Sequence, residues 1–485
     1  MRPAAGDLLQ PGRPQAASPV NRTAVKLIWP TGLVALIALA LPFGLGFDGT
    51  HVVTAALLAI LMCTVCIFNR GGGIVAAVVY LALLGDYRRF VAHFTGFPQS
   101  DPLLLVGPIV AVFLLCASLL DRGISVQSPL SRLIVLLMMF MTLEMFNPLQ
   151  GGLTVGLAGA LFYLAPLLWF WIGQKYGSKE LLEFLTFGVV VAIGVMATIW
   201  GAYQSYFGLF DFEMQWVEAI GYAALHISAD VIRPIGFFTS SAEFTRYLVV
   251  TAAIMLAAWL AGRSLLIVLM PLVLAVLFLA ASRGPVVIFA VTAVVLWAIS
   301  ARRILSWIPR LLAAAAAAAA ALILLLSLLQ SHSVGGRVAP LVDRQVEGLL
   351  NPTDPDKSTA LGHAELVRLG LGAAVTAPAG LGLGATTLAA RKYGTDLGST
   401  EIDFSNIMVS LGILGGVLYA AIVVTVLWSA VRWWKLERSR MALATVGILI
   451  GTAGGWLIGG EYSTVAFVWF CVGAMDRLSP AARRG

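Results

Sequence analysis

Long apolar runs separated by short polar segments cover most of this chain. A run of about 20 apolar residues is long enough to cross the hydrocarbon core of a bilayer as a helix. Helices are the expected spanning elements because they satisfy their own backbone hydrogen bonds inside lipid. The runs at 71–86 and 461–476 are short, so we expect about 12–14 membrane spans. The candidate spans cover residues 27–47, 51–68, 71–86, 103–120, 131–147, 151–173, 184–207, 242–262, 264–281, 284–300, 306–329, 404–431, 441–459 and 461–476.

The composition agrees with an all-α integral membrane protein: 60% of the residues are hydrophobic and only 11% are charged. Residues 1–26 are rich in Pro, Ala and Gly, and we expect them to form a disordered cytoplasmic tail. The remaining chain divides into four expected parts. These are a transmembrane bundle over 27–329 with an outer segment at 208–241, a large extracytoplasmic loop over 330–403, C-terminal spans over 404–476 and a cytoplasmic tail over 477–485.

Basic residues gather on one predicted side of the membrane. With the N-terminus in the cytoplasm, 20 of the 31 Lys and Arg residues fall on cytoplasmic segments, in agreement with the positive-inside rule. The C-terminus is then cytoplasmic as well. The net charge of +7 reflects this orientation, so no nucleic-acid partner is expected. Arg233 and Arg283 fall on the outer side, against the general bias.

Arg283 is the only charged residue between Ser264 and Ser300. An arginine at the centre of a bilayer costs about 2.5–3.5 kcal/mol, so such residues are functional candidates. Gly284 and Pro285 follow it, and proline is well tolerated at the start of a helix, where its missing N–H needs no partner. The sequence therefore predicts a tight outer hairpin at Arg283 between two spans.

The large loop over 330–403 is too long to be a plain connection, and loops of this length are usually functional. Its residues 361–377 have apolar positions at helical spacing, which predicts a helix within the loop. Outer arginines beside such a loop favour a lipid-linked phosphate or diphosphate ligand, because the planar guanidinium binds phosphate with two hydrogen bonds. Acidic residues nearby could activate an acceptor hydroxyl. The chain has no P-loop motif and no metal-ligand spacing, so we expect no cofactor and no metal.

Three stretches resemble the O-antigen ligase and polymerase superfamily of bacterial membrane glycosyltransferases. The first, Arg233-Pro-Ile-Gly-Phe-Phe, resembles the Arg-x-x-Gly-x-Phe motif of that family. The second, Ser282-Arg-Gly, resembles its Ser-Arg-Gly motif at a span boundary. The third begins with Pro378-Ala-Gly-Leu-Gly-Leu-Gly and continues into a helix bearing Gly412 and Gly415. Together they cover roughly residues 230–420.

The resemblance implies a helical fold of the GT-C kind and metal-independent, inverting transfer of a glycan from undecaprenyl diphosphate. Ligases of this family usually carry a histidine where Glu401 stands, and Asp403 follows two residues later. An acidic residue there is more similar to the polymerases. The helix within the loop often begins with an arginine in the family, and His363 takes that place here.

We therefore expect a polymerase, or a ligase, of lipid-linked glycan repeat units such as O-antigen or exopolysaccharide. Its partners are an undecaprenyl-diphosphate-linked glycan donor, a glycan acceptor, membrane lipids and other polysaccharide-assembly proteins. Its expected place is the bacterial cytoplasmic (inner) membrane, with the active site on the outer face. A flippase or another transporter is the main alternative, and a structural or assembly protein is a third. The expected catalytic residues are Glu401, Asp403 and Arg283, and the expected substrate-binding residues are Arg233, Arg246, Arg283, His363 and Arg337.

Overall fold

The structure is a computed structural model. It describes residues 29–479 apart from 35–36, 38–48, 99, 122–123, 222–224, 229, 263, 302–306, 332–334, 356, 393–397 and 458–459. The predicted N-terminal tail over 1–26 and most of the predicted tail over 477–485 lie outside the described residues. The predicted span over 27–47 is described only in part.

Helices account for nearly all the regular structure of the described chain, which contains no β-strand beyond one isolated bridge between His226 and Ile232. This confirms the all-α prediction. In chain order the α-helices are α2 (Thr50–Phe68), α3 (Arg70–Thr95), α4 (Val106–Leu120), α5 (Pro129–Glu144), α6 (Leu153–Tyr176), α7 (Lys179–Glu183), α8 (Val191–Phe207), α9 (Asp211–Ile220), α10 (Ser241–Gly262), α11 (Met270–Leu279), α12 (Arg283–Ile299), α13 (Trp307–Ser331), α14 (Ala339–Leu350), α15 (Ala360–Thr376), α16 (Leu388–Lys392), α17 (Asp403–Glu437), α18 (Arg440–Gly451) and α19 (Tyr462–Leu478).

Six continuous helical stretches of the described chain are long and apolar enough to cross a membrane. They are Thr50–Phe68, Pro102–Leu120, Leu153–Tyr176, Lys179–Phe207, Ser241–Gly262 and Asp403–Glu437. Four shorter apolar helices accompany them: Leu265–Leu279, Arg283–Ile299, Trp307–Ala320 and Arg440–Gly451. These helices indicate a multi-pass membrane protein, and the expected total of about 12–14 spans stays a prediction.

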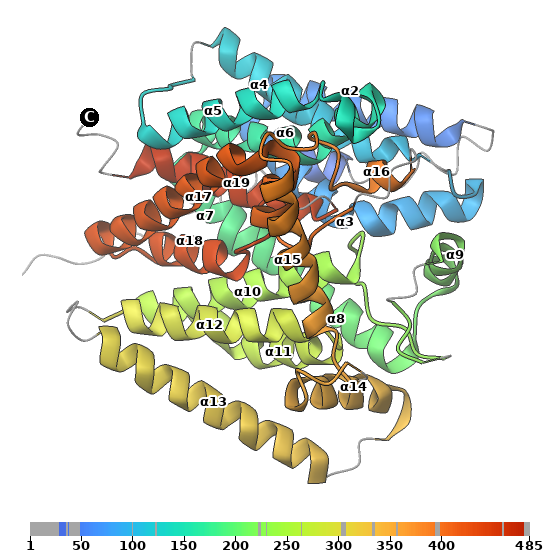
Figure 1. Cartoon of the computed structure of the whole chain (residues 1–485), viewed down its shortest axis with the longest axis vertical. Coiled ribbons are helices and arrows are strands. Elements are labelled where there is room, and N and C mark those ends of the chain that lie inside the picture. Colours follow the sequence, from blue (N-terminus) through green and yellow to red (C-terminus); the bar gives the residue numbers. More distant parts are fainter. Residues whose placement is uncertain are drawn as a thin grey trace, which may run out of the picture.

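The long helices α5, α10, α12 and α17 run in roughly the same direction in Figure 1, with α5 packed on α17 and α10 on α12. The turn between α17 and α18 and the last residues of α12 lie at the left end of this bundle. At the right end lie α9, α14 and α16, which belong to the two segments predicted to be outer. The helix predicted over 361–377 is present as α15, which packs on α17. Two regions far apart in sequence, 208–241 and 330–403, thus meet at one end of the molecule.

Two helices end at residues other than those predicted for their spans, and buried polar contacts explain both differences. The span predicted over 71–86 is part of α3, which continues to Thr95. It continues because the fully buried Arg89 is neutralised by Asp86 at 2.8 Å and donates to backbone carbonyls of the 236–238 segment. The span predicted over 441–459 ends at Gly451 as α18, because the next residues form a loop that donates hydrogen bonds to Asp403.

The helix α17 is broken at Gly412, where the backbone adopts φ 72° and ψ −171°. The segment 378–384, which carries the predicted Pro-x-x-Gly-x-Gly motif, fills the break. Ile413 N donates to Pro378 O at 3.1 Å and Leu381 N to Val409 O at 2.9 Å. Irregular backbone is tolerated at membrane depth only where protein covers it, and this segment lies against α5 and α6 through Gln150, whose Oε1 accepts from Gly384 N at 2.8 Å.

Candidate functional site

The predicted hairpin at Arg283 is present: α11 ends at Leu279 and α12 begins at Arg283. Helix α14 of the large loop packs on this hairpin, and Gln345 Nε2 donates to Ser282 O at 3.4 Å. The Arg283 guanidinium lies against Gly348 of α14, in space that any larger residue would occupy. The large loop therefore reaches back over 60 residues of sequence to cover the hairpin arginine.

Arg344, also on α14, lies close enough to Arg283 for their positive charges to repel each other. Its Nε is buried and has no hydrogen-bond partner among the described residues. None of the ion pairs found between described residues involves either arginine. Two guanidinium groups held together without a carboxylate form a site of net charge that favours an anion. We call Arg283 and Arg344 the arginine pair.

The backbone around Arg233 is held firmly in place. Arg233 N donates to Leu225 O at 2.9 Å. The two following amides, of Ile235 and Gly236, both donate to Gln204 Oε1, at 3.0 and 2.8 Å. This accounts for the Arg-x-x-Gly-x-Phe motif in physical terms, because Gly236 has φ 55°, a left-handed conformation that favours glycine.

Apolar packing brings this segment to the arginine pair. Val231, Ala281 and Leu341 form one small buried cluster. Arg233 and Arg283 each lie two residues beyond a member of that cluster, so both belong to the same part of the molecule. Arg337 lies just before α14 and rests against Gly208 at the end of α8. The structure thus gathers three of the predicted ligand-binding arginines around α14.

Arg246 lies elsewhere, in a buried polar cluster at the start of α10. Its Nε pairs with Glu461 Oε2 at 2.6 Å, and its guanidinium passes over Gly455, where a side chain would collide with it. Two further carboxylates, of Glu243 and Asp403, are fully buried nearby. We call Glu243, Asp403 and Glu461, together with Arg246, the acidic cluster.

Asp403 is fully buried, and its contacts are with protein groups. Its Oδ2 accepts from Tyr419 Oη at 2.7 Å, from Leu457 N at 3.0 Å and from Trp456 N. These bonds hold the loop between α18 and α19. Its Oδ1 is buried and has no hydrogen-bond partner among the described residues. Asp403 was predicted as a catalytic residue, and the structure shows its side chain to be fully buried.

Glu401 and His363, predicted separately, form an ion pair. His363 Nδ1 lies 3.0 Å from Glu401 Oε2, and its Nε2 lies 3.2 Å from Thr359 Oγ1. Both side chains are accessible, at 57% for His363 and 33% for Glu401. We call these two residues the His–Glu dyad. The chain connects the dyad to both other sites, because Thr359 belongs to the link between α14 and α15 and Glu401 is two residues from Asp403.

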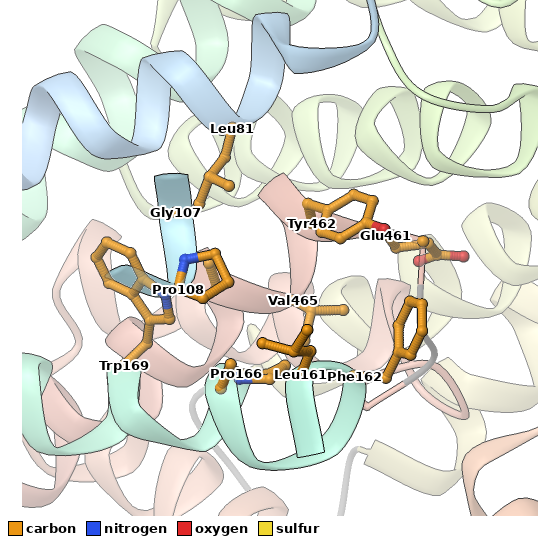
Figure 2. Close-up of a pocket in the computed structure, with 13 residues that line it drawn as sticks. Leu81, Gly107, Pro108, Leu161, Phe162, Pro166, Trp169, Glu461, Tyr462 and Val465 are labelled. Carbon is orange, nitrogen blue, oxygen red and sulfur yellow. The ribbon is translucent and has the colours of Figure 1, made fainter. Parts of the chain in front are cut away.

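A small apolar crevice of about 40 Å³ lies between α3, α4, α6 and α19 (Figure 2). Leu161, Phe162 and Trp169 of α6 line one side, and Glu461 is its only carboxylate. Because the Glu461 carboxylate is paired with Arg246, the crevice offers few polar groups to a ligand. The chemistry therefore centres on the arginine pair and the His–Glu dyad.

Arg344 and Glu461 are the two residues of this region that sequence reasoning missed. Arg344 was one of several loop arginines, and its pairing with Arg283 depends on how α14 folds back. Glu461 lies between two predicted spans, and a carboxylate in such a place was a signal of a buried partner. Among the residues that the structure describes, no three His, Cys, Asp or Glu side chains are grouped so as to hold a metal ion.

Comparison with known proteins does not assign the chain to a family: no protein-family model matches it, and no curated protein is significantly similar.

Proposed function

We propose that this chain is a membrane glycosyltransferase that polymerises, or transfers, undecaprenyl-diphosphate-linked oligosaccharide repeat units at the outer face of the bacterial cytoplasmic membrane. The observation that carries the proposal is the arginine pair. Arg283 and Arg344 repel each other and have no carboxylate partner among the described residues, so an anion would relieve the repulsion. A diphosphate fits best, because each guanidinium can bind one phosphate with two hydrogen bonds.

In the proposed reaction, an acceptor hydroxyl attacks the anomeric carbon of the donor's reducing-end sugar, and the polyprenyl diphosphate leaves. The arginine pair stabilises the negative charge that develops on the leaving group. Arg233 and Arg337, gathered at the same helix, bind further phosphate or sugar oxygens. The transfer is inverting and needs neither metal nor cofactor, as the family resemblance implies. Glu401, in place of the ligase histidine, favours a polymerase over a ligase.

The test is an in vitro assay with the full-length chain in nanodiscs and a synthetic undecaprenyl-diphosphate oligosaccharide. The Arg283→Ala and Arg344→Ala variants should each lower the rate of chain lengthening by about 100-fold or more, since removing one group that stabilises developing charge has that effect in other enzymes. Arg→Lys variants should recover only part of this loss, because lysine cannot form the two-pronged contact.

Arg440→Ala is the matched control. Arg440 is exposed and pairs with Glu183 at 2.9 Å, at the bundle end opposite α14 (Figure 1). Its removal should leave lengthening unchanged. Wild-type rates in both Arg283→Ala and Arg344→Ala, with normal amounts of folded protein, would contradict the proposal.

The broken helix α17 favours one other candidate, a lipid-linked oligosaccharide flippase. Broken helices with irregular backbone at membrane depth are common at the binding sites of transporters. A deletion of the large loop does not separate the two functions, because its residues 378–384 complete α17. Proteoliposomes separate them directly: a flippase moves the labelled lipid across the bilayer without lengthening it, and a polymerase lengthens it.

A further inference from the structure

The His–Glu dyad has the arrangement of a general base with its orienting carboxylate. His363 is flanked by Glu401 at Nδ1, 3.0 Å away, and by the Thr359 hydroxyl at Nε2, 3.2 Å away. With a proton on Nδ1 directed at the carboxylate, Nε2 is free to accept a proton. The order hydroxyl, imidazole, carboxylate is the one in which nucleophilic hydroxyls are activated in many enzymes.

The turn that carries Glu401 is fixed by its neighbours. Thr400 N donates to Asn406 Oδ1 at 2.7 Å, and Asp403 N donates to Gly454 O at 2.9 Å. Glu401 itself has φ 78°, a left-handed conformation that is rare for a residue with a side chain. Such conformations persist only where the surroundings impose them, and they are frequent at functional sites.

Helix α15 packs closely against the turn that carries Glu401. Gly370 of α15 lies against the Thr400 side chain, in space that any larger residue would fill. This close approach places α15 at the distance where His363 meets Glu401. The contact between His363 and Glu401 thus follows from the packing of α15 against the turn that carries Glu401.

We propose that His363 is the catalytic base that deprotonates the acceptor hydroxyl, and that Glu401 is a positioning residue that orients the imidazole. This inference rests on the proposed glycosyltransferase function and names the residue that activates the acceptor. The Thr359 hydroxyl marks the place that the acceptor hydroxyl takes when it binds. The other predicted base, Asp403, is fully buried, whereas both side chains of the dyad are accessible.

The step balances as follows. Nε2 of neutral His363 takes the hydroxyl proton while the acceptor oxygen forms its bond to the anomeric carbon. The bond between that carbon and the diphosphate oxygen breaks, and its electron pair leaves with the polyprenyl diphosphate. The imidazolium then gives its proton to water, and the Glu401 carboxylate stays ionised throughout.

Charged groups of the described chain near the dyad include Glu365, Arg368 and Asp403. Glu365 and Arg368, on the same helix, pair with each other at 2.5 Å and are well exposed. The third is the buried Asp403, which the protein holds through Tyr419 and backbone amides. Glu401 is therefore the one acidic group in direct contact with His363 among the described residues.

The test compares His363→Gln, Glu401→Gln and the wild-type chain for lengthening of the synthetic undecaprenyl-diphosphate oligosaccharide between about pH 5 and 8, where histidines titrate. His363→Gln should be about 100-fold slower or more, the usual contribution of a general base, with unchanged binding of the donor. Wild-type rates should fall as pH falls, because protonated histidine cannot act as a base. Glu401→Gln should lower kcat without raising KM for the donor, because the hydrogen bond at Nδ1 sets which imidazole nitrogen carries the proton.

Glu365→Gln is the matched control, since it removes a carboxylate from the same exposed helix without touching the dyad. It should keep the wild-type rate and pH profile. If the wild-type chain lengthens the oligosaccharide and His363→Gln retains that rate and pH profile, His363 is not the base and the proposed function stands. If the wild-type chain does not bind the donor or does not lengthen the oligosaccharide, the proposed function fails and the base is rejected with it.

Discussion

At the scale of single residues, buried charge in this protein is either paired or left for a ligand. Arg89 and Asp403 are fully buried and bonded to protein groups, and the half-buried Arg246 pairs with Glu461. The arginine pair and the His–Glu dyad are not enclosed in this way. Charged groups that are paired with protein groups stabilise the fold, and those that are not are available to bind a ligand.

Asp403 belongs to the first kind, so its replacement should act on stability. Asp403→Asn keeps the size of the side chain but removes the charge that accepts from Tyr419 and two backbone amides. We expect a loss of about 1–3 kcal/mol in the free energy of unfolding, the usual cost of leaving buried hydrogen-bonding groups unsatisfied. Thermal unfolding in detergent, followed by tryptophan fluorescence, measures it.

Tyr419→Phe is the comparison for this variant, because it removes one of the three donors and keeps the carboxylate. Its unfolding temperature should fall less than that of Asp403→Asn. Equal unfolding temperatures for Asp403→Asn and the wild-type chain would show that the carboxylate does not hold the loop between α18 and α19.

The sequence identified several of the important charged residues, but it did not show which of them contact each other. Arg283 stood out because no other charge lies near it along the chain. Arg344 did not, because its significance depends on α14 folding back onto the hairpin through contacts such as Gln345 with Ser282. His363 and Glu401 were both predicted, but a separation of 38 residues gave no sign that their side chains would touch.

At the scale of elements, hydrophobic runs predicted the helices well, because membrane helices need a nearly unbroken apolar sequence. The helix at 361–377 was also correct, since its pattern has helical spacing. Errors occurred where tertiary polar contacts moved a helix end, as in α3 and α18. The break in α17 was not predicted, because the surrounding sequence is as apolar as an intact span.

The break gives a prediction for Gly412. Its φ of 72° is unfavourable for any residue with a Cβ, and a Cβ there would also collide with Pro378 O. Gly412→Ala should cost at least about 1–2 kcal/mol from conformation alone and release the 378–384 segment. Limited proteolysis should then cut this segment faster than in the wild-type chain.

Gly372 provides the control, because it is an exposed glycine within the regular helix α15. A Cβ there would meet no atom within 4 Å. Gly372→Ala should therefore resist proteolysis as the wild-type chain does. Equal cleavage of Gly412→Ala and Gly372→Ala would contradict the prediction that the 378–384 segment depends on the conformation of Gly412.

At the scale of the whole molecule, the two ends of the bundle differ in chemistry. The end with α9, α14 and α16 carries the predicted outer segments, and the opposite end carries the turn between α17 and α18 (Figure 1). Basic residues Lys435, Arg438 and Arg440 surround that turn. The positive-inside rule then predicts that it faces the cytoplasm.

Labelling of single cysteines tests this orientation. Glu347 of α14 and Glu437 of α17 are exposed residues at opposite ends. In a background with the four native cysteines replaced by alanine, a membrane-impermeant maleimide should label Glu347→Cys from outside intact spheroplasts. Glu437→Cys should react only after the membrane is opened. The reverse pattern would place the arginine pair in the cytoplasm and exclude the proposed donor site.

The large loop has two parts that differ in how well they tolerate a change in length: the connection between α14 and α15, and the 378–384 segment that packs into the break of α17. Between α14 and α15, Pro352, Thr353, Pro355 and Lys357 lie exposed in turns. Doubling the length of a flexible connection costs only about 0.6 kcal/mol. One residue inserted within 378–384 would instead shift every later backbone group out of register with Val409 to Ile413. Over the course of divergence, insertions and deletions should accumulate in the first part and be absent from the second. The connection between the arginine pair on α14 and His363 on α15 should therefore vary in length among descendants of this chain, whereas the 378–384 segment should keep its length.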